Sequence, residues 1–235
     1  MAGEMARSSA HELPVRAGAP WWAWLYGWAC QRLYHELAWG YDWVSLVVSA
    51  GRWSVWRQCV LRHLEADAGA QRPDLRILEL GFGTGELLLA LARRGFAVTG
   101  LEPSAAMHAV TARKLERAQQ SVACVQGMAQ AQPFADATFD RIVSTFPAAF
   151  IVDEQTLAES ARLLAEDGQL IVVGLWVRLQ PRWLGALVPL FYGEPDPKQK
   201  LEIEARLARA GFAVEWREQV DGPFAVAVLI GRKVR

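Results

Sequence analysis

The sequence predicts an α/β fold with a mainly parallel sheet of seven strands, helices on both faces and an antiparallel hairpin at the end. Three observations support this prediction. From Leu75 onward, short apolar runs alternate with helical patterns. The first run, RILEL, ends in a glycine-rich turn. The last two runs are separated by the short turn DGP, so these adjacent strands must be antiparallel.

The predicted elements follow one another in a regular order. Strands are expected at 76–80, 96–102, 121–127, 139–146, 168–177, 212–220 and 224–234. Helices are expected at 86–95, 104–118, 154–168 and 201–211. Gly95 suits the C′ position of the first helix, and Ser104 suits the N-cap of the second.

The N-terminal part of the chain has a different character. Eight of the eleven tryptophans precede residue 57, and apolar residues recur there at helical spacing. We therefore expect a disordered tail at 1–18, a tryptophan-rich helical cap at 19–68, and the α/β domain at 69–235. The apolar run at 19–30 is too short to span a bilayer, which takes about 20 residues.

The composition of the chain indicates which kinds of partner and which cellular compartment to expect. Lys plus Arg equals Asp plus Glu, at 25 each, so no global charge draws the chain to nucleic acid. The cysteines Cys30, Cys59 and Cys124 are scattered in apolar runs. This pattern indicates reduced thiols in a cytoplasm-like compartment, with neither a disulfide framework nor a metal site.

The stretch ILELGFGTGE carries the strongest chemical signal. Gly81, Gly83 and Gly85 follow a buried strand and precede a helix, so a ligand can approach bare backbone and unpaired N–H groups. A dinucleotide site of the G-x-G-x-x-G type needs a third glycine three residues after Gly83. That position is Glu86, a carboxylate where a diphosphate would lie. A nicotinamide oxidoreductase is therefore the least favoured alternative.

Two acids near this turn suit a different ligand. Glu79 precedes the first glycine by two residues and can meet an ammonium group, while Glu102, at the end of the next strand, can accept both hydroxyls of a ribose. A cation and an adenosine without phosphate together describe S-adenosylmethionine.

Three motifs resemble those of the class I S-adenosylmethionine-dependent methyltransferases, which have a Rossmann-like fold. They are E-x-G-x-G-x-G at 79–85, VTGLEPSAAM at 98–107 and PFADATFDRIVSTF at 133–146. The resemblance extends over residues 40–235 and includes the closing hairpin. It implies a cofactor site formed by Glu79, Gly81, Phe82, Gly83, Gly85, Glu102, Pro103, Met128, Ala129 and Phe146. Met128 stands where many relatives have an acid that binds the adenine amino group, so backbone groups and apolar packing are expected to hold adenine here.

Within that family, GYDWVSLVVSAGRWSVWR at 40–57 looks most like the ubiquinone and menaquinone C-methyltransferases. Those enzymes usually carry an Arg-Asn pair after the fourth strand, whereas this chain has Ala149 and Phe150 there. The resemblance implies a small apolar or amphipathic acceptor, either quinone-like or lipid-like, beneath the cap.

Polar candidates for the catalytic site are few. Tyr41, Asp42 and His35 are the candidate catalytic residues, although Asp42 also suits a helix cap and His35 a surface position. His63 and His108 are expected to face solvent.

Two further functions stay open at the level of sequence. The chain could be a phospholipid or amine N-methyltransferase at a membrane surface, or a non-catalytic cofactor-binding interaction protein. Residues 175–192 contain aromatic and basic side chains among aliphatic ones, and no acidic residue occurs through residue 193. Together with the cap they suit either a peripheral membrane contact or a buried crossover.

Overall fold

The computed structural model describes residues 53–68, 74–179 and 197–234. The helices are α3 (Trp53–Ala68), α4 (Glu86–Ala92), α5 (Ala105–Arg117), α6 (Glu154–Leu163) and α8 (Pro197–Arg209), with a 3₁₀ helix η3 (Ala149–Val152) before α6. The strands are β1 (Arg76–Leu80), β2 (Ala97–Glu102), β3 (Ala123–Gln126), β4 (Phe139–Thr145), β5 (Leu164–Leu179), β6 (Phe212–Asp221) and β7 (Phe224–Lys233).

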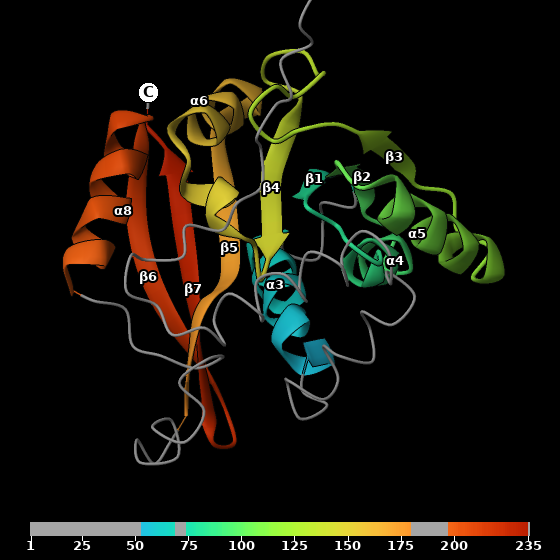
Figure 1. The fold of residues 1–235 in the computed structure, drawn as a ribbon, viewed down its shortest axis with the longest axis horizontal. Coiled ribbons are helices and arrows are strands. Elements are labelled where there is room, and N and C mark those ends of the chain that lie inside the picture. Colours follow the sequence, from blue (N-terminus) through green and yellow to red (C-terminus); the bar gives the residue numbers. More distant parts are fainter. Residues whose placement is uncertain (1–52, 69–73, 180–196, 235) are drawn as a thin grey trace, which may run out of the picture.

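The seven strands form one sheet in the order β3-β2-β1-β4-β5-β7-β6 (Figure 1). The first five pair in parallel, and β7 is antiparallel to both β5 and β6. The predicted sheet and its closing hairpin are therefore confirmed. Strand order reverses between β1 and β4, and in open α/β sheets ligands bind at the carboxyl ends of the strands at such a point.

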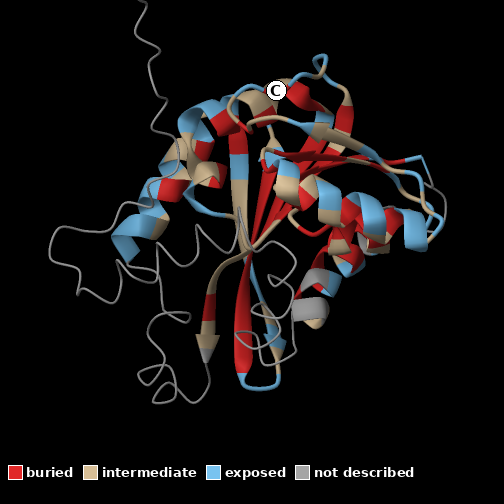
Figure 2. Cartoon of the chain, turned by 45° about the vertical axis from the view of Figure 1, so that its right-hand side comes forward, coloured by how far each residue is buried: buried red, intermediate tan, exposed pale blue. Residues whose placement is uncertain are grey.

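Neighbouring residues of β1 face two separate cores. Ile77 belongs to the core covered by α3 and α4, while Leu78 belongs to the core covered by α6 and α8. A strand covered on both faces must be apolar at consecutive positions, which explains the unbroken apolar runs in the sequence. In Figure 2 the central strands are buried, while the outer sides of the helices are exposed.

The predicted helix caps are present. The Ser104 hydroxyl accepts a hydrogen bond from the Met107 N–H, as an N-cap should. Gly95 has φ +80°, and the N–H of Phe96 donates to the Leu91 carbonyl, the bond that closes a Schellman motif.

Two predicted helix boundaries were wrong by four residues or more. The helix expected at 201–211 begins at Pro197. The helix expected at 154–168 ends at Leu163, and β5 begins at Leu164 instead of residue 168. Leu164 pairs with Phe139 of β4 before a shift in register, and Asp167 adopts φ +60°. Pairing with β4 thus outweighs the helical propensity of these residues.

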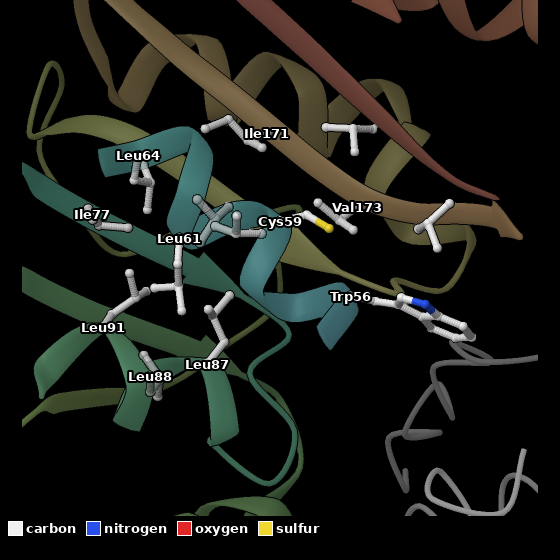
Figure 3. Close-up of a cluster of buried hydrophobic side chains, with 14 of the residues drawn as sticks. Trp56, Cys59, Leu61, Leu64, Ile77, Leu87, Leu88, Leu91, Ile171 and Val173 are labelled. Atoms are coloured by element: carbon white, nitrogen blue, oxygen red, sulfur yellow. The ribbon is translucent and has the colours of Figure 1, made fainter. Parts of the chain in front are cut away.

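The described end of the predicted cap packs directly on the sheet. Trp56, Val60 and Leu64 of α3 are buried in the same core as the α4 leucines (Figure 3). The tail and residues 19–52 lie outside the described residues, so the proposed domain boundaries stay predictions.

Candidate functional site

The glycine turn between β1 and α4 has a backbone that other residues would not adopt easily. Gly81, Gly83 and Gly85 have φ of +69°, +51° and +73°. A Cβ at Gly85 would lie 2.4 Å from Cγ2 of Thr111, whereas a Cβ at Gly83 would meet no atom within 4 Å. The turn is therefore packed against α5 at Gly85 and leaves bare backbone at Gly83.

Glu102 connects this turn to the end of β2. Its carboxylate accepts from the Gly83 N–H at 3.2 Å and from the Ser104 N–H at 2.9 Å, and the side chain is fully buried. Thr111 completes the arrangement by donating to the Gly83 carbonyl at 2.9 Å. A carboxylate can accept about four hydrogen bonds, so holding the turn is compatible with accepting from ribose hydroxyls.

Glu79 lies on the other side of the turn. It is 2% exposed and shares a row of the sheet with Gly100 and Cys124. Burial, and after it the negative charge of Glu79, raises the pKa of the Cys124 thiol. Two carboxylates beside bare backbone fit a ligand with a cationic end and a ribose, and they oppose a diphosphate.

The predicted adenine segment lies beside the end of β2. The Gly127 N–H donates to the Glu102 carbonyl, and the Gln126 amide donates to the Pro103 carbonyl at 3.1 Å. Met128 is partly exposed and Ala129 is buried. The structure thus brings these residues to the same edge as the glycine turn.

Phe82 and His108 occupy positions that the sequence did not reveal. The Phe82 side chain is 4% exposed, and its ring lies 4.9 Å from the His108 ring in an edge-on arrangement. A Cβ at Gly100 would lie 2.5 Å from the Phe82 ring. Phe82 is therefore a core side chain. The prediction that His108 faces solvent was wrong, because it is half-buried and its Nε2 lies 2.9 Å from the Glu102 carbonyl oxygen.

Aromatic rings line the end of β4. Phe146 has φ +50°, donates its N–H to the Val173 carbonyl at 2.7 Å, and fills the space above Gly174. Four residues later, Phe150 in η3 approaches the glycine turn, since a Cβ at Gly81 would lie 3.1 Å from its Cζ. Phe150, which packs against the core under α6, thus gives the turn an apolar neighbour at Gly81, while Phe146 packs against the core under α3.

The candidate catalytic residues Tyr41, Asp42 and His35 lie outside the described residues, so their roles stay predictions. Among residues 53–68, 74–179 and 197–234, no cluster of side chains could hold a metal ion. No helix in those same ranges is long and apolar enough to cross a membrane.

The described part of the aromatic and basic segment, 175–179, makes intramolecular contacts. Trp176 lies 4.6 Å from Trp216 between ring centroids, and Arg178 forms an ion pair with Glu218. These two side chains thus pack on β6.

Comparison with known proteins agrees with this geometry. Residues 77–168, which contain the glycine turn, Glu102 and the end of β4, match the family described as "Methyltransferase domain". A demethylmenaquinone methyltransferase of Thermus thermophilus is 29% identical over 224 residues, covering 83% of this chain and 98% of that protein. These matches and the fold identify the chain as an S-adenosylmethionine-dependent methyltransferase with the class I fold. The cofactor expected from Glu79, Glu102 and the glycines is therefore S-adenosylmethionine.

Further relatives of this methyltransferase share its central part. A 2-phytyl-1,4-naphtoquinone methyltransferase of Thermosynechococcus vestitus is 34% identical over 147 residues, covering 61% of the chain and 63% of the relative. The match thus spans less than two thirds of that protein. A geranyl diphosphate C-methyltransferase from Streptomyces coelicolor has the same fold, with a TM-score of 0.58, 15% identity, and coverage of 77% of this chain and 79% of its own.

Proposed function

We propose that this methyltransferase transfers the methyl group of S-adenosylmethionine to an apolar ring acceptor of the quinone type. The carrying observation is the apolar ring of Phe150 beside the glycine turn at Gly81, together with Phe146 at the carboxyl end of the neighbouring strand β4. The names of the Thermus and Thermosynechococcus relatives support a quinone over other apolar acceptors.

The residues of this chain would hold both reactants rather than activate them. Glu79 would bind the ammonium group of the cofactor, Glu102 the ribose, and the backbone around Gly83 the methionine end. When bound, the cofactor supplies an already activated methyl group on a sulfonium. The protein therefore has to align the acceptor with that methyl and exclude water, and an apolar side chain such as Phe150 beside the turn favours the exclusion of water.

The segment after β4 offers no general base. Residues 145–152, TFPAAFIV, contain no ionisable side chain. Methylation of a quinol carbon is helped by removing a phenolic proton. Tyr41, Asp42 and His35 remain our candidates for that step.

The test of the acceptor is a methylation assay with isotopically labelled S-adenosylmethionine. A reduced naphthoquinone with a short prenyl chain is compared with vesicles of phosphatidylethanolamine, and the product is located by mass spectrometry and NMR. We expect methylation of a ring carbon of the naphthoquinol. Methylation of the lipid amine would instead support the membrane-surface alternative, and cofactor binding without any methylation would support a non-catalytic interaction protein.

The test of the cofactor site is calorimetry with S-adenosylmethionine and S-adenosylhomocysteine. Glu102→Gln should weaken binding by about 1 to 3 kcal/mol, because a charge-assisted hydrogen bond to the ribose becomes a neutral one. Glu116→Gln, at an exposed position of α5, is the matched control and should bind normally. Equal affinities for the two variants would remove the ribose role from Glu102.

A further inference from the structure

Trp56 of α3 lies inside the molecule beside the end of β4. Its side chain is 2% exposed. The indole is tilted against Phe146, with 5.6 Å between ring centroids, and meets Phe224 edge-on at 5.2 Å. Figure 3 shows the ring projecting beyond the aliphatic side chains of the cluster, with its nitrogen on the edge toward β5. The indole therefore connects Phe146, at the carboxyl end of β4, with the core under α3.

The indole nitrogen of Trp56 is a buried donor without an acceptor. Its Nε1 has no hydrogen-bond partner in the part of the chain that the structure describes. Buried tryptophan N–H groups usually find a partner, and a donor left unsatisfied loses its bond to water without compensation. Trp216 shows the usual outcome, since its Nε1 donates to Glu204 at 2.6 Å although the residue is only half-buried.

The surroundings of this donor place it at the acceptor side of the site. Phe146, whose ring lies 5.6 Å from the indole, directly follows β4, and the neighbouring strand β1 leads into the glycine turn. Trp56 is thus one ring removed from the segment that adjoins the cofactor turn. An apolar acceptor bound beside Phe146 would come close to the indole, and the N–H of that indole is a donor.

We propose that the indole N–H of Trp56 donates a hydrogen bond to a ring oxygen of the methyl acceptor and thereby orients the ring. The inference rests on the proposed function, because it requires an acceptor that carries oxygen. An indole N–H is a donor only, so it selects carbonyl or hydroxyl oxygens. An amine acceptor would give up its reacting lone pair to this bond, which disfavours amines. Trp56 is a positioning residue in this scheme, since it holds the acceptor and exchanges no proton.

The direct test follows the indole N–H of Trp56 by NMR in protein with ¹⁵N-labelled tryptophan and bound S-adenosylhomocysteine. The probes are 1,4-naphthoquinone and naphthalene, which has the rings without the oxygens. We expect the Trp56 signal to move downfield with the quinone only. The signal is assigned by its absence in Trp56→Phe or, if that variant does not fold, by its proximity to the rings of Phe146 and Phe224 in wild-type protein.

The kinetic test compares Trp56→Phe, which keeps an aromatic ring and removes the donor, with Trp216→Phe as the matched control. Trp56→Phe should raise KM for the naphthoquinol about tenfold, because a tenfold change corresponds to the loss of one hydrogen bond to a buried donor. The change in KM for S-adenosylmethionine should be smaller. Trp216→Phe should leave both constants unchanged.

The outcomes separate the two proposals. If naphthoquinol is methylated but the Trp56 signal does not respond to the quinone, the proposed function stands and the role of Trp56 is refuted. An unchanged KM for the acceptor in a folded Trp56→Phe protein would have the same meaning. If the protein neither binds the quinone nor methylates the quinol, both proposals are overturned.

Discussion

Replacing Gly85 with alanine tests whether the turn is fixed by packing against α5. The new Cβ would lie 2.4 Å from Cγ2 and 2.8 Å from Oγ1 of Thr111, a fully buried residue. Gly83→Ala is the matched control in the same turn, because its φ is also positive but no atom lies within 4 Å of the new Cβ. The two variants share the backbone strain and differ in the contact.

The magnitudes follow from these distances. A left-handed conformation costs a residue other than glycine about 1 kcal/mol, and this is the whole loss of stability expected for Gly83→Ala. Gly85→Ala adds about 1 to 3 kcal/mol for overpacking against Thr111. Displacing Thr111 also weakens its hydrogen bond to the Gly83 carbonyl, worth about 1 kcal/mol. We therefore expect Gly85→Ala to lose roughly 3 to 5 kcal/mol.

The assay is urea unfolding followed by tryptophan fluorescence, without S-adenosylmethionine, because bound cofactor would stabilise the native state. Thr111→Ser removes the closest methyl group, so the double variant Gly85→Ala with Thr111→Ser should be more stable than the sum of the single effects predicts, by about 1 kcal/mol or more. Equal losses for Gly85→Ala and Gly83→Ala, or strict additivity with Thr111→Ser, would refute the packing argument.

Three further predictions concern stability and reactivity. Burial raises the pKa of Asp140, but hydrogen bonds from Arg76 and the charge of Arg76 outweigh burial and leave the pKa below its usual value. The stability that this ion pair adds is present above about pH 4 and is lost as the pH falls. Lowering the pH should therefore reduce the free energy of unfolding of Asp140→Asn less than that of wild type, by about 0.5 to 1 kcal/mol for a partly exposed pair. Burial raises the pKa of the Cys59 and Cys124 thiols, and Cys59 is buried whereas Cys124 is half-buried. Peptide mapping after a short pulse of iodoacetamide at pH 7.5 should therefore find Cys59 unmodified in folded protein and modified in urea, with Cys124 modified more slowly in folded protein than in urea. Rapid labelling of Cys59 in folded protein would contradict its burial. Gly174 has a φ of +86°, and the methyl group of Gly174→Ala would lie 2.4 Å from the phenyl ring that follows β4. The melting temperature of this variant should therefore fall by several degrees in calorimetry. An unchanged melting temperature would show that the ring moves freely.

The order of elements was readable from the sequence because it depends on local patterns. Apolar runs of strand length, helical periodicity, and caps such as Ser104 and Gly95 each act within a few residues. The position of Glu79 and Glu102 at one edge also followed, since the carboxyl ends of parallel strands meet there. The turn between β6 and β7 was short enough to dictate antiparallel pairing. These features needed no knowledge of contacts between distant residues.

The end of α6 was not readable in this way. The residues after Leu163 continue a helical pattern, yet they pair with β4, a strand about 25 residues earlier in the chain. The helix propensity of these residues is worth a few tenths of a kcal/mol each, and hydrogen bonds to the neighbouring strand outweigh it. No local sequence pattern predicts those hydrogen bonds.

The amino-acid sequence by itself determined the fold, the cofactor class and the two carboxylates that flank the glycine turn, because spacing along the chain fixes all three. Only the tertiary structure decided which side chains are buried near the glycine turn and the end of β4. The side chain of Phe82, whose cofactor role stays a prediction, packs in the core, and Trp56, one tryptophan among eleven, holds a buried N–H without a partner among the described residues. The physical reason is that burial and hydrogen-bond satisfaction arise between residues far apart in the chain, here α3 and the ends of β4 and β7.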